Sequence, residues 1–313
     1  MKILVTGGAG FIGSHLAEKL TWDGHEVTVL DALSDFLYPR NLKEQNIKEI
    51  TSHGIRFIQA DMAKDNLLPA VEGQQIIINQ AAIPGLVKSW THLDQYVQSN
   101  IVGLGRLLEA ALRSSIEKFI QISTSSVYGR DAVGNEDSLK TPYSPYGVTK
   151  LSAENLVKAY EANFNLDVTI LRYFSVYGPR QRPDMAYHKF INAIRRNETI
   201  TIFGDGHQSR SNTYVGDVVN ATIASLYLDD CPGGKVFNIA GSESWELLQV
   251  IEKIEDILGK KAIIRFEPTR YGDQQITRGE TTKAQKFLKW NAETNINEGL
   301  EKQIEWHLKS NSI

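Results

Sequence analysis

The sequence of 313 residues contains a single cysteine, Cys231, so the chain cannot form an internal disulfide. It has no excess of basic residues, with 34 Lys and Arg against 37 Asp and Glu, which disfavours nucleic-acid binding. No apolar run approaches the roughly 20 residues of a membrane helix. The short run after Met1 ends at Thr6, too early for a signal peptide. These absences predict a protein of a reducing, cytoplasmic compartment with no nucleic-acid or membrane partner.

Short apolar segments alternate with helical patterns through the first half of the chain. Each apolar segment is about as long as one strand, and between them apolar residues recur three and four positions apart, as on one face of a helix. The strand-like segments are residues 2–8, 25–31, 55–61, 75–82, 118–124 and 167–174, with a seventh at 235–241. This alternation predicts an α/β fold of Rossmann type, with a doubly wound parallel sheet and crossover helices.

Three glycines follow the first predicted strand with the spacing of a dinucleotide-binding turn. Gly7 permits a tight turn, Gly10 lets a pyrophosphate approach the backbone, and Gly13 lets the next helix pack on the strand. The following strand ends at Asp31, where a carboxylate would bind ribose hydroxyls and repel a 2'-phosphate. Because no Arg or Lys follows until Arg40, the motif predicts NAD rather than NADP.

The strand and helix rhythm breaks after the sixth strand into loops rich in Gly, Pro and Arg. We therefore predict a NAD-binding Rossmann domain made of residues 1–174 plus 213–240. Residues 175–212 plus 241–313 would form a smaller α/β substrate-binding lobe, with helices at 186–197, 244–259 and 296–309.

Tyr146 and Lys150 lie four residues apart at the start of a predicted helix, on one face. A phenol with an unperturbed pKa of about 10 is a poor base at neutral pH, so its phenolate needs stabilisation that Lys150 and oxidised NAD can supply. Thr124 ends a strand beside the cofactor crevice, where its hydroxyl could hydrogen-bond the reacting oxygen. Without the glycine motif, the pair would be typical of a surface helix, and the Thr/Ser cluster typical of a turn.

These motifs together resemble the extended short-chain dehydrogenase/reductase superfamily. The resemblance rests on T-G-G-A-G-F-I-G at the N-terminus, S-x-x-V-Y-G after Thr124 and Y-x-x-x-K at Tyr146. It covers essentially the whole chain in the NAD-dependent nucleotide-sugar epimerase and dehydratase branch. The segments R-Y-F-S-V-Y-G-P-R-Q-R-P-D-M-A and T-Y-V-G-D-V-V-N-A resemble the UDP-glucuronate 4-epimerase group, with the UDP-glucose 4-epimerases nearby.

The resemblance implies a role for each of several residues. For catalysis it implies Thr124, Tyr146 and Lys150. For NAD it implies Gly7, Gly10, Phe11, Ile12, Gly13, Asp31, Asp61, Met62, Ala81, Ala82, Asn100, Tyr146, Lys150 and Tyr173. For the UDP-sugar it implies Ser125, Ser126, Ser175, Arg182, Arg210, Arg270 and Asp273, with Arg210 and Arg270 facing the diphosphate and Ser175 and Arg182 as candidate anchors of a sugar carboxylate. The seven histidines have no metal-binding spacing, so no metal is expected.

The expected reaction is inversion at C4 of a UDP-sugar, most simply UDP-glucuronate to UDP-galacturonate, through a 4-keto intermediate. Dehydratases of the superfamily carry an acidic pair after the Thr, and decarboxylases carry a Glu at the second position, where this chain has Ser125 and Ser126. Gly216, Gln80 and Asn212 depart from the family pattern, which leaves UDP-glucose or UDP-N-acetylglucosamine as alternative substrates. A 4-keto reductase is a further alternative, although Asp31 argues against NADPH.

Two predicted helices carry apolar faces that would exceed what the sheet covers. In similar proteins the corresponding helices form a four-helix contact between two subunits, so we expect a homodimer. The apolar residues are Val97, Ile101, Leu104, Leu108, Val148, Leu151 and Val157.

Overall fold

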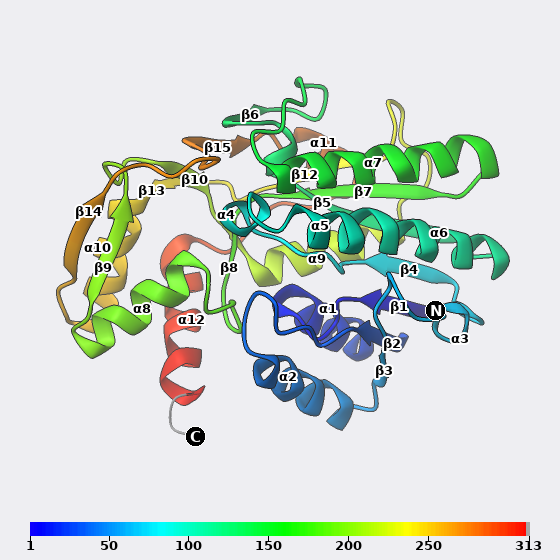
Figure 1. The fold of residues 1–313 in the computed structure, drawn as a ribbon, viewed down its shortest axis with the longest axis horizontal. Coiled ribbons are helices and arrows are strands. Elements are labelled where there is room, and N and C mark those ends of the chain that lie inside the picture. The colour runs from blue at the N-terminus through cyan, green and yellow to red at the C-terminus, as the bar shows by residue number, and fades with distance from the viewer. Residues whose placement is uncertain (311–313) are drawn as a thin grey trace.

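The computed structural model describes residues 1–310 and contains one large parallel sheet (Figure 1). Its strands, in spatial order, are β12 (Val236–Ile239), β7 (Val168–Tyr173), β5 (Lys118–Thr124), β4 (Ile76–Asn79), β1 (Lys2–Thr6), β2 (Glu26–Asp31) and β3 (Arg56–Gln59). Every neighbouring pair is parallel. All seven predicted strands are present, and the predicted doubly wound parallel sheet is confirmed.

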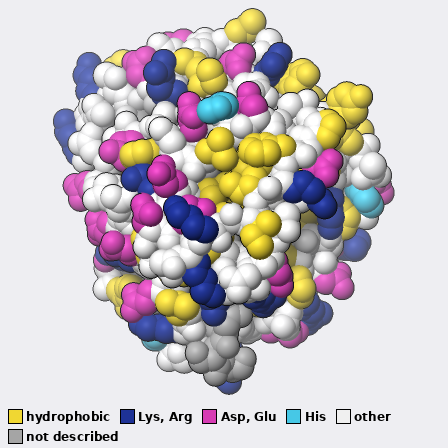
Figure 2. All heavy atoms as spheres, turned by 90° about the vertical axis from the view of Figure 1, so that its left-hand side faces the viewer, with side chains coloured by type: hydrophobic (Ala, Val, Ile, Leu, Met, Phe, Trp, Pro, Cys, Tyr) yellow, Lys and Arg dark blue, Asp and Glu magenta, His cyan; other side chains and the backbone are white. Residues whose placement is uncertain are grey.

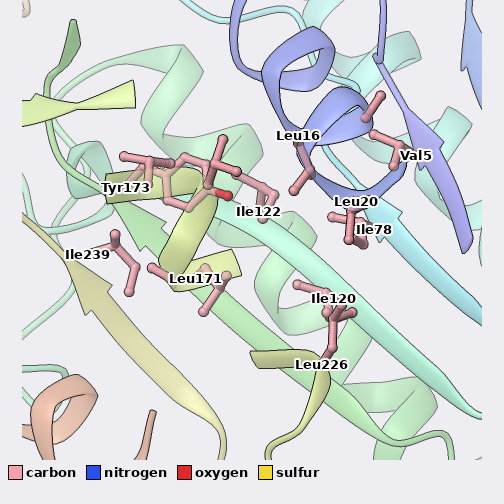
Figure 3. Packing of buried hydrophobic residues seen from close by; sticks show 14 of the residues in the cluster. Val5, Leu16, Leu20, Ile78, Ile120, Ile122, Leu171, Tyr173, Leu226 and Ile239 are labelled. Carbon is pink, nitrogen blue, oxygen red and sulfur yellow. The ribbon is translucent and has the colours of Figure 1, made fainter. Parts of the chain in front are cut away.

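Helices cover both faces of this sheet because successive strand residues point to opposite sides. Ile3 and Val5 of β1 pack into one apolar core, shown in Figure 3, with α1 (Phe11–Trp22), α2 (Arg40–Ser52) and α9 (Val215–Leu226). Leu4 packs into a second core on the other face, with α3 (Leu68–Val71), α6 (Gly103–Arg113) and α7 (Pro145–Phe164). The short helix α11 (Thr282–Phe287) contributes Ala284 to the first core.

Four short elements line the carboxyl edge of the sheet. After β4 the chain forms α4 (Leu86–Ser89) and α5 (Leu93–Val97), then a π-helical turn over Gln98–Val102 that leads into α6. After β5 it forms a 3-10 turn over Ser125–Val127. Their position follows from the parallel sheet, since every strand delivers its following loop to the same edge.

The remaining elements form a smaller lobe with its own apolar core. A four-stranded sheet has the order β13 (Ser244–Glu246), β10 (Ser209–Ser211), β15 (Ile276–Gly279) and β6 (Asp131–Gly134). Two strand pairs join β14 (Ile263–Glu267) to β9 (Thr199–Phe203) and β11 (Thr213–Tyr214) to β8 (Val176–Tyr177). Helices α8 (Ala186–Arg196), α10 (Leu247–Leu258) and α12 (Ile296–Ser310) supply the core. Figure 2 shows this end of the molecule, where acidic, basic and apolar side chains are interspersed.

Two details differ from the simplest expectation for this lobe. The helix expected from Ser244 begins at Leu247, because Ser244–Glu246 pairs with β10 and Glu246 then caps the helix reciprocally with Gln249. Strand β6 comes early in the chain yet pairs with β15. The division into residues 1–174 plus 213–240 and 175–212 plus 241–313 stays a prediction.

A loop at residues 178–185 ties the small lobe to the first two helices of the large sheet. Arg180, with a left-handed φ of 61°, donates two hydrogen bonds of 2.9 Å to the buried carboxylate of Glu18 on α1. It also lies 2.9 Å from Glu49 on α2. The Pro179 carbonyl is 2.9 Å from the His15 ring. This loop is therefore held in place by α1 and α2.

Among the described residues, no helix has both the length and the apolar character needed to cross a bilayer.

Candidate active site

The glycine turn after β1 leaves room for a ligand because three backbone segments approach closely there. Gly7 has a φ of 68°, and its carbonyl accepts a hydrogen bond of 3.1 Å from the Gly10 amide. A Cβ on Gly7 would lie 2.8 Å from the Ala81 backbone after β4. A Cβ on Gly13 would lie 2.8 Å from Gly8 Cα and would collide with the Gly7 carbonyl. Glycine is thus required sterically at both ends of this turn.

A cavity of about 580 Å³ opens at this turn, in the crevice between the carboxyl ends of β1 and β4. All of the following predicted cofactor residues line it: Gly7, Gly10, Phe11, Ile12, Gly13, Asp31, Asp61, Met62, Ala81 and Ala82. The α1 N-terminus faces the crevice, where its free amides favour an anion. The donors and the room both fit a dinucleotide, with the glycine turn holding the pyrophosphate.

Asp31 is held rigidly at the end of β2. One carboxylate oxygen accepts a hydrogen bond of 3.1 Å from the Ala9 amide, and the other accepts one of 2.8 Å from the Leu33 amide. Burial raises the pKa of Asp31, while the positive charge of Lys43 and the two amides lower it. The carboxylate thus stays oriented toward the cavity that it lines.

Lys43 is a cavity residue that the sequence analysis missed. Arg40, the first basic residue after Asp31, turns away to Glu44 at 2.7 Å, whereas Lys43 lines the cavity and donates to the Ser34 carbonyl at 2.6 Å. The signal was a basic residue one turn into α2. Its position could not be inferred, because it depends on the irregular course of residues 32–39.

Asn100 does not line the cavity but supports a segment that does. It lies in the π-helical turn, accepts a 2.8 Å hydrogen bond from the Ile83 amide and donates one of 3.1 Å to the Ile83 carbonyl. Its amide also donates to Thr149 Oγ1 of α7 at 3.1 Å. Asn100 therefore couples the strand β4 loop to the helix that carries Tyr146 and Lys150.

Tyr146 and Lys150 face the sheet from the first turns of α7. Ser144 caps this helix by accepting the Gly147 amide at 3.1 Å. A Cβ on Gly147 would lie 2.6 Å from the Ser126 carbonyl, so glycine lets the helix approach the turn after β5. The Tyr146 phenol is hydrogen-bonded to Thr124, and Lys150 Nζ donates to the Ile122 carbonyl at 2.6 Å. Both helix side chains therefore contact the last three residues of β5, Tyr146 at Thr124 and Lys150 at Ile122.

Burial shifts the pKa of both helix residues, Tyr146 and Lys150. Burial raises the pKa of Tyr146, whereas its hydrogen bond to Thr124 and the positive charge of Arg182 lower it. Burial lowers the pKa of Lys150 to about 8, and the negative charge of Glu154 opposes that change. Lys150 follows Tyr146 by one turn of α7, and a positive charge near a phenol favours its phenolate, so this arrangement suits a phenol that takes a proton from a hydroxyl and returns it.

A second cavity, of about 340 Å³, lies in the small lobe and is lined by Ser175, Arg210 and Asp273. Arg210 donates to the Ser209 carbonyl at 2.9 Å, to the Gln275 carbonyl at 3.0 Å and to the Gln274 carbonyl. Within residues 1–310 it forms no ion pair shorter than 4 Å. A guanidinium held by carbonyls alone keeps its charge available to an anion. Ser125 and Ser126 are buried in the 3-10 turn after β5 and do not line this cavity.

Three predicted residues lie apart from the cavity in which they were expected to act. Arg182 lines the first cavity rather than the second and binds Asp184 through two hydrogen bonds of 2.9 and 2.8 Å. The Arg270 guanidinium stacks 3.1 Å from the Phe203 ring centre and faces a neighbouring groove. The Tyr173 hydroxyl is hydrogen-bonded to Thr222 inside the core, as Figure 3 shows for its ring.

Comparisons with known proteins agree with this geometry. The model of the NAD dependent epimerase/dehydratase family matches residues 3–240. The chain is 43% identical over 310 residues to "Uncharacterized UDP-glucose epimerase YtcB" of Bacillus subtilis (strain 168), with 97% of each chain covered. It is 37% identical to the UDP-glucuronate 4-epimerase of Thermodesulfobacterium geofontis (strain OPF15), covering 97% of this chain and 95% of that one. The crystal structure of the Bacillus cereus UDP-glucuronic acid 4-epimerase in complex with UDP-glucuronic acid and NAD matches with a TM-score of 0.95 and 40% identity, covering 99% of this chain and 100% of that one.

The chain belongs to the NAD dependent epimerase/dehydratase family. The predicted superfamily, Rossmann-type fold and NAD cofactor are thereby confirmed. The roles of individual residues stay predictions.

Gly13→Ala tests the cofactor turn. The added methyl group would collide with the Gly7 carbonyl and push α1 away from β1, at a cost of about 1–3 kcal/mol. We expect NAD affinity, measured by isothermal titration calorimetry, to fall about tenfold or more. Gly105→Ala on α6 is the control, since its Cβ would meet only the Leu156 side chain of α7, at 4.0 Å. Unchanged NAD affinity in Gly13→Ala would contradict the assignment of this turn.

Proposed function

We propose that this protein is a UDP-sugar 4-epimerase that interconverts UDP-glucuronate and UDP-galacturonate through a transient 4-keto sugar. One observation carries the proposal. Tyr146, whose phenol is hydrogen-bonded to Thr124, precedes the buried Lys150 by one turn of α7. The same fold holds a dinucleotide cavity and a second cavity lined by Arg210, whose guanidinium is bound by backbone carbonyls. The relatives named as UDP-glucuronate 4-epimerases support the sugar.

The residues around Tyr146 perform the proton chemistry of this reaction. NAD in the first cavity supplies the acceptor and donor for the C4 hydride. Tyr146 takes the C4 hydroxyl proton, and Lys150 stabilises the resulting phenolate. Thr124 holds the reacting oxygen beside the phenol. The keto sugar then rotates in the site, so that the hydride returns to the opposite face of C4. The same phenol returns its proton to the oxygen, and C4 has the opposite configuration.

The absence of acid groups next to Thr124 favours epimerisation over other fates of the keto sugar. Ser125 and Ser126 are buried hydroxyls, which cannot serve as the strong acid and base that water elimination from the sugar needs. A 4-keto uronate is a β-keto acid and can lose carbon dioxide, so the carboxylate must be held firmly. Hydrogen bonds from serine hydroxyls, and a salt bridge from a nearby arginine, would do this.

The UDP moiety fits the second cavity by charge. Arg210 presents a guanidinium fixed by three carbonyls, and Asp273 lies close enough to it to raise the pKa of Arg210 against the effect of burial. The negative charge of Asp273 also acts to raise the pKa of Arg270, whose guanidinium stacks on the Phe203 ring. We propose that Arg210 binds the diphosphate and that Arg270 joins it from the adjoining loop.

UDP-glucose is the second candidate substrate, for a specific reason. Arg182 is already neutralised by Asp184, so it offers less charge to a sugar carboxylate than an unpaired arginine would. The 43% identical Bacillus subtilis relative is also named as a UDP-glucose epimerase. A neutral C6 hydroxymethyl group would leave the Arg182 and Asp184 pair undisturbed.

The substrate is decided by incubating the purified enzyme, without added NAD, with UDP-glucuronate, UDP-glucose and UDP-N-acetylglucosamine separately, and following products by NMR. We expect UDP-galacturonate from UDP-glucuronate without pentose. Tyr146→Phe removes the proposed base and should lower kcat about 10²- to 10⁴-fold. Conversion of a neutral sugar alone would move the assignment to a hexose epimerase, and full activity of Tyr146→Phe would exclude the phenol as base.

Arg182→Ala tests the carboxylate anchor. If Arg182 leaves Asp184 to bind the substrate, its loss removes a charged hydrogen bond worth about 1.5–3 kcal/mol. We expect the KM for UDP-glucuronate to rise about tenfold or more, with pentose among the products. Asp184→Asn is the matched variant, because it frees the arginine and should leave affinity unchanged or tighter. Equal affinity and product ratio in Arg182→Ala and the wild type would remove this role.

We propose that the protein works as a homodimer in the cytoplasm. Leu104, Leu108 and Val157, expected on the contact surface, are buried in the monomer core, so the contact must use other residues of the same helices. Val102 and Val148 are exposed to 38% and 49%. Fractionation of the source cells would check the compartment.

Val102→Glu tests the dimer by placing a charge on the exposed helical surface. Light scattering at micromolar concentration should give twice the chain mass of 35.1 kDa for the wild type and one chain mass for the variant. Val133→Glu on β6, where the valine is 42% exposed, should stay dimeric. A monomeric wild type would rule out the proposed assembly.

A further inference from the structure

A buried ion pair lies directly behind the active site, between α7 and the sheet. Arg172 of β7 donates to both carboxylate oxygens of Glu154, from Nη2 at 2.7 Å and from Nε at 2.9 Å. Ser123 Oγ donates to the same carboxylate at 2.6 Å. Both charged side chains are only 1% exposed.

Ser123 and Glu154 lie close in the chain to predicted site residues, and Arg172 lies next to the register partner of one. Ser123 precedes Thr124 on β5, and Glu154 follows Lys150 by one turn of α7. Arg172 precedes Tyr173, which is in register with Thr124. The cluster therefore connects β5, β7 and α7 one helical turn after Lys150.

Stability alone does not account for this pair. Taking both charges out of water costs several kcal/mol per ion, and well-packed apolar residues of the same volume are often equally stable or better. The apolar neighbours on this face, Ala153 and Val157, show that α7 and the sheet can pack without charges. A buried pair in this position needs a further reason.

The chemistry of Lys150 provides that reason. Its ammonium is removed from water and donates a hydrogen bond of 2.6 Å to the Ile122 carbonyl. Burial favours the neutral amine, and Glu154 is the carboxylate whose charge opposes this effect. A neutral Lys150 could not stabilise a Tyr146 phenolate.

We propose that Glu154 and Arg172 are a positioning pair for Lys150, in which Arg172 and Ser123 hold the Glu154 carboxylate immobile one turn behind the ammonium, so that the ammonium stays charged and directed at the β5 edge. The catalytic consequence rests on the proposed function, but the effect on Lys150 does not.

Arg172 is itself fixed from a third side, which keeps the carboxylate in one orientation. Its Nη1 donates to the Tyr128 hydroxyl at 2.7 Å and to the Glu136 carbonyl at 3.0 Å. The Tyr128 hydroxyl donates onward to Asn238 Oδ1 at 2.7 Å. This series of hydrogen bonds thus runs from α7 to β12 and to the segment just after β6. Strand β6 pairs with β15 in the sheet of the small lobe.

Other titratable groups lie around the pair and around Lys150. Glu136 and Tyr128 contact Arg172, and Lys140 lies close enough to Arg172 and Glu154 for its pKa to be affected by both. Lys150 has Tyr146 and Glu154 on its own helix, and Arg182 reaches Tyr146 from the 178–185 loop. Of these, Glu154 is the acidic group that acts on Lys150.

The test measures the protonation of Lys150 directly, with no substrate present. Lysine side chains are labelled with carbon-13 at Cε, the Lys150 signal is assigned with Lys150→Arg, and the whole protein is titrated by NMR. Glu154→Gln should lower the Lys150 midpoint by about one pH unit, since the favourable charge is lost while burial remains. Turnover should fall about tenfold on the alkaline side of its pH profile, because Lys150 then loses its proton at lower pH.

A double variant covers the case in which Glu154→Gln leaves Arg172 unpaired and fails to fold. Glu154→Gln/Arg172→Met removes both charges at similar volume and should restore the thermal midpoint while the Lys150 midpoint stays low. The control is Asp167→Asn, which breaks an ion pair of 2.7 Å with Lys235 at the far end of β7 and should leave Lys150 unaffected. A folded double variant with the wild-type Lys150 midpoint would overturn the proposal. The NMR result holds whichever sugar is the substrate, so it is independent of the proposed function.

Discussion

Strand β1 pairs with β2 on one side and β4 on the other, and the position of every site residue depends on this pairing. The chain leaves β1 and β4 toward opposite faces of the sheet, so a crevice opens where their loops separate. Gly7 and Ala81 mark the two walls of that crevice, and their backbones are too close for a side chain on Gly7. The remaining strands add residues to the same edge because they run parallel.

The predicted catalytic groups depend on a second constraint, which is the close packing of α7 against the sheet. Gly147 permits the approach to the turn after β5, and the Glu154 and Arg172 pair fixes the helix one turn deeper. Tyr146 is next to the first of these contacts, and Lys150 lies between the two. Burial alone would favour the neutral forms of both side chains, so the charges placed around them decide whether they can exchange a proton.

Three arginines of the small lobe differ in their partners. Arg180 pairs with buried Glu18, Arg182 pairs with Asp184, and among the described residues Arg210 donates to backbone carbonyls. An arginine that already has a carboxylate partner stabilises the loop, whereas one held by carbonyls keeps charge for a ligand. In the loop at 178–185 both Arg180 and Arg182 have carboxylate partners, and Arg182 in addition lines the cofactor cavity.

The sequence by itself determined the elements that follow local rules. Alternating apolar segments, a glycine spacing and Asp31 at a strand end were sufficient for the seven strands, the Rossmann-type fold and most of the cofactor cavity, because these depend on residues near one another in the chain. Tertiary structure alone decided the place of Lys43, the separation of Arg182 and Arg270 from the second cavity, and the burial of Leu104 and Leu108. It also brought Ser123, Glu154 and Arg172 together from three elements, since a charge network depends on packing between segments that no local pattern connects.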